Sequence, residues 1–229
     1  MKYKYIFFDL DDTLWAFSIN AKQTLTEVYE ALNFSLYFNS YKHFYSLYKE
    51  VNSKVWDLYG KGAITKEELI SVRSSFPFEQ VGVKDKQLIR KFSDTYYALM
   101  KEKELLEPYA KEILTYLHPQ YKLAILSNGF KELQFLKLER PGIAHFFEQV
   151  ILSEHVGVMK PSPELFYFAL KKMGATAENS IMVGDNIDTD IRGAHRVGMD
   201  QIYYNPRSLE TSFKATYEIK HLSQIEELL

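Results

Sequence analysis

Short apolar runs alternate with amphipathic segments at the start of the chain and through its second half. The apolar runs are rich in β-branched and aromatic residues, which favours strands. They lie at residues 5–8, 123–126, 150–152, 181–183 and 201–204. The segments between them carry apolar residues at helical spacing, at residues 109–117, 131–138, 163–173 and 190–197. This alternation predicts an α/β fold, a doubly wound parallel sheet with helices on both faces.

Residues 16–102 carry a different pattern. Apolar residues recur there three and four positions apart, and strand-like alternation is scarce. Thr65 and Glu68 have the spacing of a capping box at the start of a helix. We therefore predict a helical domain over residues 16–102, inserted into an α/β core domain that comprises residues 1–15 and 103–229.

The composition is that of an ordinary globular protein. The chain has 229 residues, 46% of them hydrophobic and 25% charged, with a formal net charge of −2. No basic excess points to a nucleic-acid polymer as partner. Cysteine is absent, which excludes disulfides, thiolate metal sites and cysteine catalysis. With no apolar run near the roughly 18 residues of a membrane helix and no signal peptide before the first strand, we expect a cytoplasmic protein without a membrane partner.

Two carboxylates, Asp9 and Asp11, follow the first predicted strand. Alternation places them on the same side of an extended backbone, where two like charges repel each other. A divalent cation between them, or a proton kept by one of them, relieves that repulsion. The pair therefore fits a metal-assisted reaction with one Asp as nucleophile and the other as acid or base. The alternative is an acidic loop tip that merely ends a strand.

Two further polar segments follow predicted strands. Ser127, Asn128 and Gly129 offer a hydroxyl and loop amides at the start of a helix, which can hold a phosphate. The alternative is a turn that caps that helix. Lys160 comes a short loop after the third strand, where it could neutralise a carboxylate and a phosphate oxygen together. The alternative is a solvated lysine, which is the commoner case.

Asp185 lies just past the apolar run 181–183, and Asp188 and Asp190 come close behind it. One of these two could cap a helix, and the sequence leaves open whether either touches a metal. All the polar segments sit at the carboxyl ends of predicted parallel strands, where such sheets bind ligands. Together they offer metal ligands, a nucleophile, an acid or base, a phosphate-binding loop and a cation. These are the groups needed for phosphoryl transfer through an aspartyl intermediate.

The order of these motifs resembles that of the haloacid dehalogenase superfamily of phosphohydrolases, which has a Rossmann-like core. The matching motifs are Asp9-Leu10-Asp11-Asp12-Thr13, Ser127, Lys160, and Gly184-Asp185 with Asp190. The predicted helical domain resembles the α-helical cap of that superfamily, so the resemblance covers the whole chain. Within the superfamily, Ser127-Asn128-Gly129-Phe130 and Val156-Gly157-Val158-Met159-Lys160-Pro161 look like the pyrimidine 5′-nucleotidase group, the house-cleaning nucleotidases.

The resemblance implies a Mg²⁺-dependent phosphomonoester hydrolase. In that reading Asp9 is the nucleophile that forms a phosphoaspartate. Asp11 protonates the leaving alcohol and then deprotonates the attacking water. Mg²⁺ is held by the Asp9 carboxylate, the Asp11 backbone carbonyl and Asp185, and Asp190 lies behind these ligands.

The resemblance also implies a phosphate site. Its residues are Asp12, Ser127, Asn128 and Lys160. Ser127 and the amide of Asn128 hold phosphate oxygens and Lys160 offsets their negative charge, so that Ser127 and Lys160 act in catalysis as well as in binding. The implied substrate is a small phosphorylated metabolite, with a nucleoside 5′-monophosphate expected for the nucleotidase group. A monomer or a homodimer is expected.

Trp15 and Phe17, near the junction of the predicted domains, could select the substrate by stacking on a nucleobase, although aromatic residues at such spacing usually pack a core. Other functions stay open: a phosphoglycolate or sugar phosphate phosphatase, a phosphomutase, a haloacid dehalogenase, or a non-enzymatic binding protein. Asp11 argues against dehalogenation, which releases no alcohol to protonate. The clustered carboxylates argue against a non-enzymatic binding protein, because their mutual repulsion would lower the stability of the fold without serving a reaction.

Overall fold

The computed structural model describes residues 2–229 and divides the chain into two compact units. One unit comprises the chain up to Ser18 together with Glu104–Leu229, and the other comprises Ile19–Lys103. None of the described helices is both long and apolar enough to cross a membrane.

A parallel sheet forms the centre of the first unit. Its strands are β1 (Tyr5–Phe8), β2 (Lys122–Ser127), β3 (Phe147–Leu152), β4 (Ser180–Gly184), β5 (Asp200–Tyr204) and β6 (Tyr217–Ile219). They lie in the order β3-β2-β1-β4-β5-β6, and every pair is parallel. The α/β prediction is confirmed, with five strands where the apolar runs indicated them. The sequence pattern missed β6, which is too short to show a periodicity.

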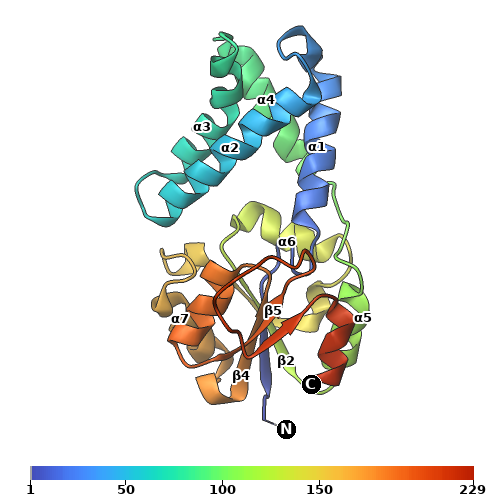
Figure 1. The fold of residues 1–229 in the computed structure, drawn as a ribbon, viewed down its shortest axis with the longest axis vertical. Coiled ribbons are helices and arrows are strands. Elements are labelled where there is room, and N and C mark those ends of the chain that lie inside the picture. Colours follow the sequence, from blue (N-terminus) through green and yellow to red (C-terminus); the bar gives the residue numbers. More distant parts are fainter. Residues whose placement is uncertain (1) are drawn as a thin grey trace. The chain divides into compact units, whose positions relative to one another are not determined.

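Helices connect these strands and cover both faces of the sheet. They are α5 (Ala110–Leu117), α6 (Lys131–Glu139), α7 (Pro163–Met173) and α8 (Arg192–Arg196). The chain moves from β1 to β2 and β3 in one direction, then crosses back and moves from β4 to β6 in the other. Right-handed crossovers therefore place α5 and α6 on one face and α7 and α8 on the other. Figure 1 shows α5 and α7 on opposite sides of the strands.

The segment after β4 differs from its prediction. Instead of one helix over residues 190–197, a π-helical turn spans Ile187–Ile191 and α8 follows it. The cap of this turn is the Asn186 side chain, which accepts hydrogen bonds from the backbone amides of Asp188 and Thr189. Neither Asp188 nor Asp190 is the capping residue, so the side chain of Asp190 is available for other contacts.

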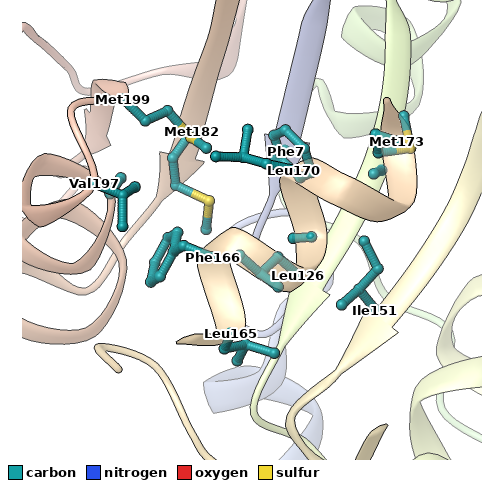
Figure 2. Packing of buried hydrophobic residues seen from close by; sticks show 13 residues of the cluster. Phe7, Leu126, Ile151, Leu165, Phe166, Leu170, Met173, Met182, Val197 and Met199 are labelled. Carbon is teal, nitrogen blue, oxygen red and sulfur yellow. The ribbon is translucent and has the colours of Figure 1, made fainter. Parts of the chain in front are cut away.

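Apolar side chains fill the space between the sheet and α7. Phe7, Leu126, Ile151 and Met182 of the sheet lie against Phe166 and its neighbours on α7 (Figure 2). Each such side chain contributes about 1.5–3 kcal/mol when it is fully buried. This packing holds the carboxyl ends of the strands rigidly, which is where the polar residues of interest lie.

Four helices make up most of the second unit. They are α1 (Phe17–Ala31), which begins in the first unit, α2 (Tyr41–Gly60), α3 (Lys66–Gln80) and α4 (Lys86–Met100). The capping box predicted at Thr65 and Glu68 is confirmed: the Thr65 hydroxyl accepts from the Glu68 amide, and the Glu68 carboxylate accepts from the Thr65 amide.

Aromatic side chains form the core of this helical unit. The buried ring of Phe34 lies 5.2 Å from the ring centroid of Phe44, 5.0 Å from that of Phe78 and 5.6 Å from that of Phe92, with edge-to-face geometry. Such pairs add about 0.5–1.5 kcal/mol each beyond the area that they bury. The high aromatic content of the chain is thus largely explained by packing in this unit.

Candidate active site

Two acidic residues meet where the order of the strands reverses. β1 and β4 are neighbours from which the chain departs in opposite directions, and the crevice at their carboxyl ends is where parallel sheets bind ligands. Asp9 follows β1, and its backbone amide donates to the Val183 carbonyl of β4 over 2.9 Å. Asp185 follows β4, and its amide donates to the Thr13 hydroxyl over 3.1 Å. These bonds hold the two carboxylates side by side.

Lys160 brings a positive charge into this crevice. Its Nζ lies 2.5 Å from Oδ1 of Asp9, 2.7 Å from Oδ1 of Asp190 and 2.7 Å from the Leu126 carbonyl oxygen. The Lys160 side chain is almost completely buried, so the ion pairs are shielded from solvent. The loop that carries Lys160 thus places a cation against Asp9.

Burial and mutual repulsion shift the titration of the carboxylates. Burial together with the charge of Asp190 raises the pKa of Asp9 to about 7, although Lys160 acts in the opposite direction. Burial and the charges of Asp190 and Asp9 raise the pKa of Asp185 to about 9. Burial alone would lower the pKa of Lys160, but Asp190 and Asp9 outweigh it and raise that pKa. Asp9, Asp185 and Asp190 are therefore too many carboxyl groups for Lys160 alone to neutralise.

A hard divalent cation fits this surplus of carboxylate oxygens. Asp9, Asp185 and Asp190 each offer an oxygen, and the three oxygens lie within 4.8 Å of one another. Asp190 is already engaged, because its carboxylate accepts from Lys160, from the Asn186 amide at 3.1 Å and from Thr189 at 3.2 Å. Asp9 and Asp185 are consequently the side chains best placed to hold a metal, while Asp190 orients Lys160.

Gly184 leaves the space that Asp190 occupies. A Cβ atom on Gly184 would lie 2.4 Å from Oδ2 of Asp190, closer than two such atoms can approach. Because Gly184 has no side chain, the Asp190 carboxylate can occupy this space and contact Lys160.

The predicted phosphate loop lies beside Lys160. The buried Ser127 hydroxyl accepts from the Gly129 amide at 3.1 Å. The Asn128 side chain forms two hydrogen bonds with the backbone of Lys160, accepting from its amide at 2.8 Å and donating to its carbonyl at 3.1 Å. These bonds tie the loop after β2 to the loop that carries the lysine.

Asp11 contacts two residues that the sequence analysis did not single out. Its Oδ1 accepts from Nζ of Lys137 at 2.6 Å, and its Oδ2 accepts from Nε2 of Gln134 at 2.9 Å. Gln134 Nε2 also donates to the Ser127 hydroxyl at 2.9 Å. The sequence did contain a signal for this contact. Gln134 and Lys137 are three positions apart on α6, so they share a helical face, and a buried helical face is normally apolar.

Asp12 forms its hydrogen bonds in and just after the turn that follows Asp11. Its backbone amide donates to the Trp15 carbonyl at 2.8 Å, and its carboxylate accepts from the backbone amide and hydroxyl of Ser18. Its positive φ of 59° belongs to the tight turn after Asp11. The amide and the carboxylate of Asp12 thus have protein partners in this segment, and phosphate binding at Asp12 stays a prediction.

The burial of Trp15 favours a packing role for this residue over stacking on a nucleobase. Its ring is 0% exposed, and Nζ of Lys137 lies 4.7 Å from its centroid. A nucleobase cannot reach a face that protein atoms cover. Phe17 is partly exposed, with Nζ of Lys137 5.1 Å from its ring and the Trp15 ring 6.3 Å away.

A cation from the loop after β5 also approaches the crevice. Nη2 of Arg207 lies 3.9 Å from Oδ2 of Asp185 and 4.0 Å from Oδ2 of Asp12. Its side chain is 59% exposed, so this pairing is weak. No pattern in the sequence indicates this contact, because it depends on how a loop returns over the sheet.

Sequence comparisons show similarity between this chain and known enzymes. The profile of the haloacid dehalogenase-like hydrolases matches residues 3–198. The pyrimidine 5′-nucleotidase YjjG of Escherichia coli is 31% identical over 233 residues, which span 100% of this chain and 99% of that enzyme. A glyceraldehyde 3-phosphate phosphatase of Methanothermobacter thermautotrophicus is 30% identical over 241 residues, 99% of both chains.

A solved structure shares the whole fold. The crystal structure of the hydrolase YfnB from Bacillus subtilis, bound to magnesium, superposes with a TM-score of 0.90 and 25% sequence identity. The match covers 100% of this chain and 99% of that one.

Proposed function

The chain belongs to the haloacid dehalogenase-like hydrolases, and we propose that it hydrolyses phosphomonoesters with Mg²⁺ through a phosphoaspartyl intermediate on Asp9. Relatives with similar sequences include enzymes named as phosphatases for small phosphorylated metabolites. The finer proposal is that the substrate is a nucleoside 5′-monophosphate.

One observation carries the proposal: Asp9 lies at the reversal point of the sheet between Lys160 and Asp185. The nucleophile must stay charged and must approach a phosphorus atom surrounded by negative oxygens. Lys160, 2.5 Å from Asp9, favours the anionic form of that carboxyl group and can offset charge on the phosphate. Mg²⁺ held by Asp9, the Asp11 carbonyl and Asp185 would offset further negative charge on the phosphate.

In the first step an Oδ atom of Asp9 attacks the phosphorus. The bond from phosphorus to the leaving oxygen breaks, and Asp11 donates a proton to that oxygen, which leaves as an alcohol. Ser127 and the backbone amide of Asn128 hold the phosphate oxygens during this transfer. The product of the step is a phosphoaspartate at Asp9.

In the second step water cleaves that intermediate. Asp11, now a carboxylate, takes a proton from the water, and the resulting hydroxide attacks phosphorus. The bond between phosphorus and Asp9 breaks, which releases inorganic phosphate and restores the free carboxylate. Asp11 thus returns to its protonated form at the end of the cycle.

We assign the helical unit, Ile19–Lys103, the role of a cap that excludes water and selects the leaving group. The core residues named above act on phosphate and metal, which every monoester offers equally. Discrimination between substrates must then come from residues outside that set.

The nucleotide assignment rests on YjjG, a pyrimidine 5′-nucleotidase aligned over the full chain. A sugar phosphate is the second candidate, because the glyceraldehyde 3-phosphate phosphatase aligns equally fully at nearly the same identity. Dehalogenase activity is less consistent with Asp11, because dehalogenation releases no alcohol that needs a proton. A phosphomutase would need a phosphoaspartate protected from water and stays an alternative.

A substrate panel tests both levels of the proposal. Phosphate release is measured from pyrimidine and purine nucleoside 5′-monophosphates, glyceraldehyde 3-phosphate, phosphoglycolate and a hexose phosphate, with Mg²⁺ or with EDTA. We expect Mg²⁺-dependent turnover with the highest kcat/KM for a pyrimidine nucleotide, and none in an Asp9→Asn control. Full activity in EDTA would refute the metal-dependent mechanism. A better rate with glyceraldehyde 3-phosphate would refute only the nucleotide assignment.

A further inference from the structure

Two polar side chains of α6 are buried on the face that meets Asp11. Gln134 and Lys137 are three positions apart, so they are neighbours on one face of the helix. Gln134 is 0% exposed and Lys137 is 5% exposed. Burying an amide and an ammonium group is unfavourable unless both are paired. Their partner therefore explains why this face is polar.

That partner is one carboxylate, held at both oxygens. Lys137 donates to Oδ1 of Asp11 over 2.6 Å, and Gln134 donates to Oδ2 over 2.9 Å. Because the two donors come from one helix and each takes a different oxygen, they define both the position and the plane of the carboxylate. Among the residues that the structure describes, these are the two side chains found donating to Asp11.

The donors are themselves held in place. Nζ of Lys137 lies 4.7 Å from the ring centroid of Trp15 and 5.1 Å from that of Phe17, within the range of cation–π attraction. The Gln134 amide also donates to the Ser127 hydroxyl, and it fills the space beside Gly129, where a Cβ atom would lie 1.6 Å from Nε2. Neither donor can move without disturbing several neighbours.

We propose that Lys137, supported by Gln134, is a positioning residue that aims the Asp11 carboxyl group at the leaving oxygen. The inference rests on the proposed function, in which Asp11 is the acid and base. Proton transfer requires hydrogen-bond reach between donor and acceptor, so an acid that swings freely loses most of its effect. Trp15 and Phe17 act through Lys137 in this arrangement, by confining its ammonium group.

The test compares substrates that differ only in their need for an acid. Phenyl phosphate has a poor leaving group that must be protonated, whereas 2,4-dinitrophenyl phosphate expels a stable anion without help. Lys137→Met should lower kcat/KM for phenyl phosphate by about 10–100-fold, part of the 10²–10⁴-fold acceleration that general acid catalysis supplies. This ratio reports the steps up to formation of the phosphoaspartate, in which only the acid role of Asp11 acts, so kcat/KM for the dinitrophenyl ester should stay within about 3-fold of wild type. The second step, in which Asp11 acts as base, is common to both esters and contributes to kcat alone.

Two further variants test whether the lost rate comes from a displaced Asp11 carboxyl group, and not from misfolding or from the loss of any positive charge on α6. Lys137→Arg keeps a cation that can pair with Asp11 and should recover most of the lost rate with phenyl phosphate. Lys131→Met removes an exposed lysine from the same helix and should leave both rates unchanged. If Lys137→Met does not fold, Lys137→Gln, which keeps a hydrogen-bond donor, is measured in its place with the same pair of esters.

Equal losses of kcat/KM with both esters, or an unchanged kcat/KM with phenyl phosphate, would each overturn the inference. A wild-type protein that releases no phosphate from any ester with Mg²⁺ would overturn the proposed function itself. An active wild type with parallel losses in the variant overturns only the role of Lys137, so the two failures are distinguishable.

Discussion

The ammonium nitrogen of Lys160 lies 2.5 Å from Oδ1 of Asp9, and both side chains are almost entirely shielded from solvent. Such a pair is a poor source of stability, because taking two charges out of water costs about as much as their attraction returns. Its consequence is asymmetric: removing one partner leaves the other charge buried and uncompensated. The same contact that prepares the nucleophile therefore makes the fold depend on the lysine.

Replacing Lys160 with Met should destabilise the protein by about 3–5 kcal/mol, because Asp9 and Asp190 lose their common counter-charge. Urea unfolding in EDTA at pH 8 measures the change. Lys171→Met, which removes an exposed lysine of α7, is the matched control and should lie within about 0.5 kcal/mol of wild type. An equal effect of the two substitutions would contradict the importance of the buried pair.

Replacing Asp9 with Asn should abolish turnover while the fold survives. Loss of the nucleophile is expected to lower kcat by at least about 10³-fold. Stability should not fall, because the neutral amide avoids the burial cost that raises the pKa of Asp9, and Lys160 keeps its contact with Asp190. Phosphate release and a thermal melt of the same sample check both parts. Retention of a tenth of the wild-type rate would exclude Asp9 as the nucleophile.

Stability without metal should fall as pH rises through the range set by Asp185. The folded-state pKa of this group is raised from 3.8 to about 9, so between these values the folded protein binds more protons than the unfolded chain. Its contribution is fully present below about pH 4 and is lost by about pH 9. Melting temperatures in EDTA across this range measure the trend.

Mg²⁺ should counteract that loss, so the shift in melting temperature on adding Mg²⁺ should increase from pH 6 to pH 9. Asp185→Asn should show a flatter pH profile in EDTA and a smaller response to Mg²⁺. A response to Mg²⁺ that is the same in the variant and in wild type would show that the cation binds elsewhere.

Replacing Trp15 with Ala should affect stability and all substrates together. Its ring is completely buried, and removing a buried aromatic side chain costs about 3–5 kcal/mol. Since protein atoms cover the ring, kcat/KM for a nucleotide and for a sugar phosphate, whose leaving alcohols both need the acid, should fall in parallel. A selective loss of nucleotide turnover would restore the stacking hypothesis for this residue. Phe17→Ala, at a partly exposed position, is the comparison variant.

Much of the architecture follows from local patterns in the sequence. The apolar run before Asp9 forms β1 with the predicted bounds, Tyr5–Phe8, and the helix predicted over residues 163–173 is α7. Strand and helix periodicities depend on neighbouring residues alone, so they can be read without knowing the fold. The placement of Asp9 and Asp185 directly after apolar strands is visible for the same reason.

Contacts between distant residues were decided by the tertiary structure. Nothing in the local pattern shows that β1 lies beside β4, so the meeting of Asp9 with Asp185 had to be expected from a general property of parallel sheets. Lys137 reaches Asp11 across 126 positions of the chain, and its helical face carries no periodicity that names its partner. The burial of Trp15 could not be predicted from the sequence either, because it depends on which segments cover its ring. A sequence determines which side chains share an element, whereas packing determines which elements meet, and the chemistry of this site arises where they meet.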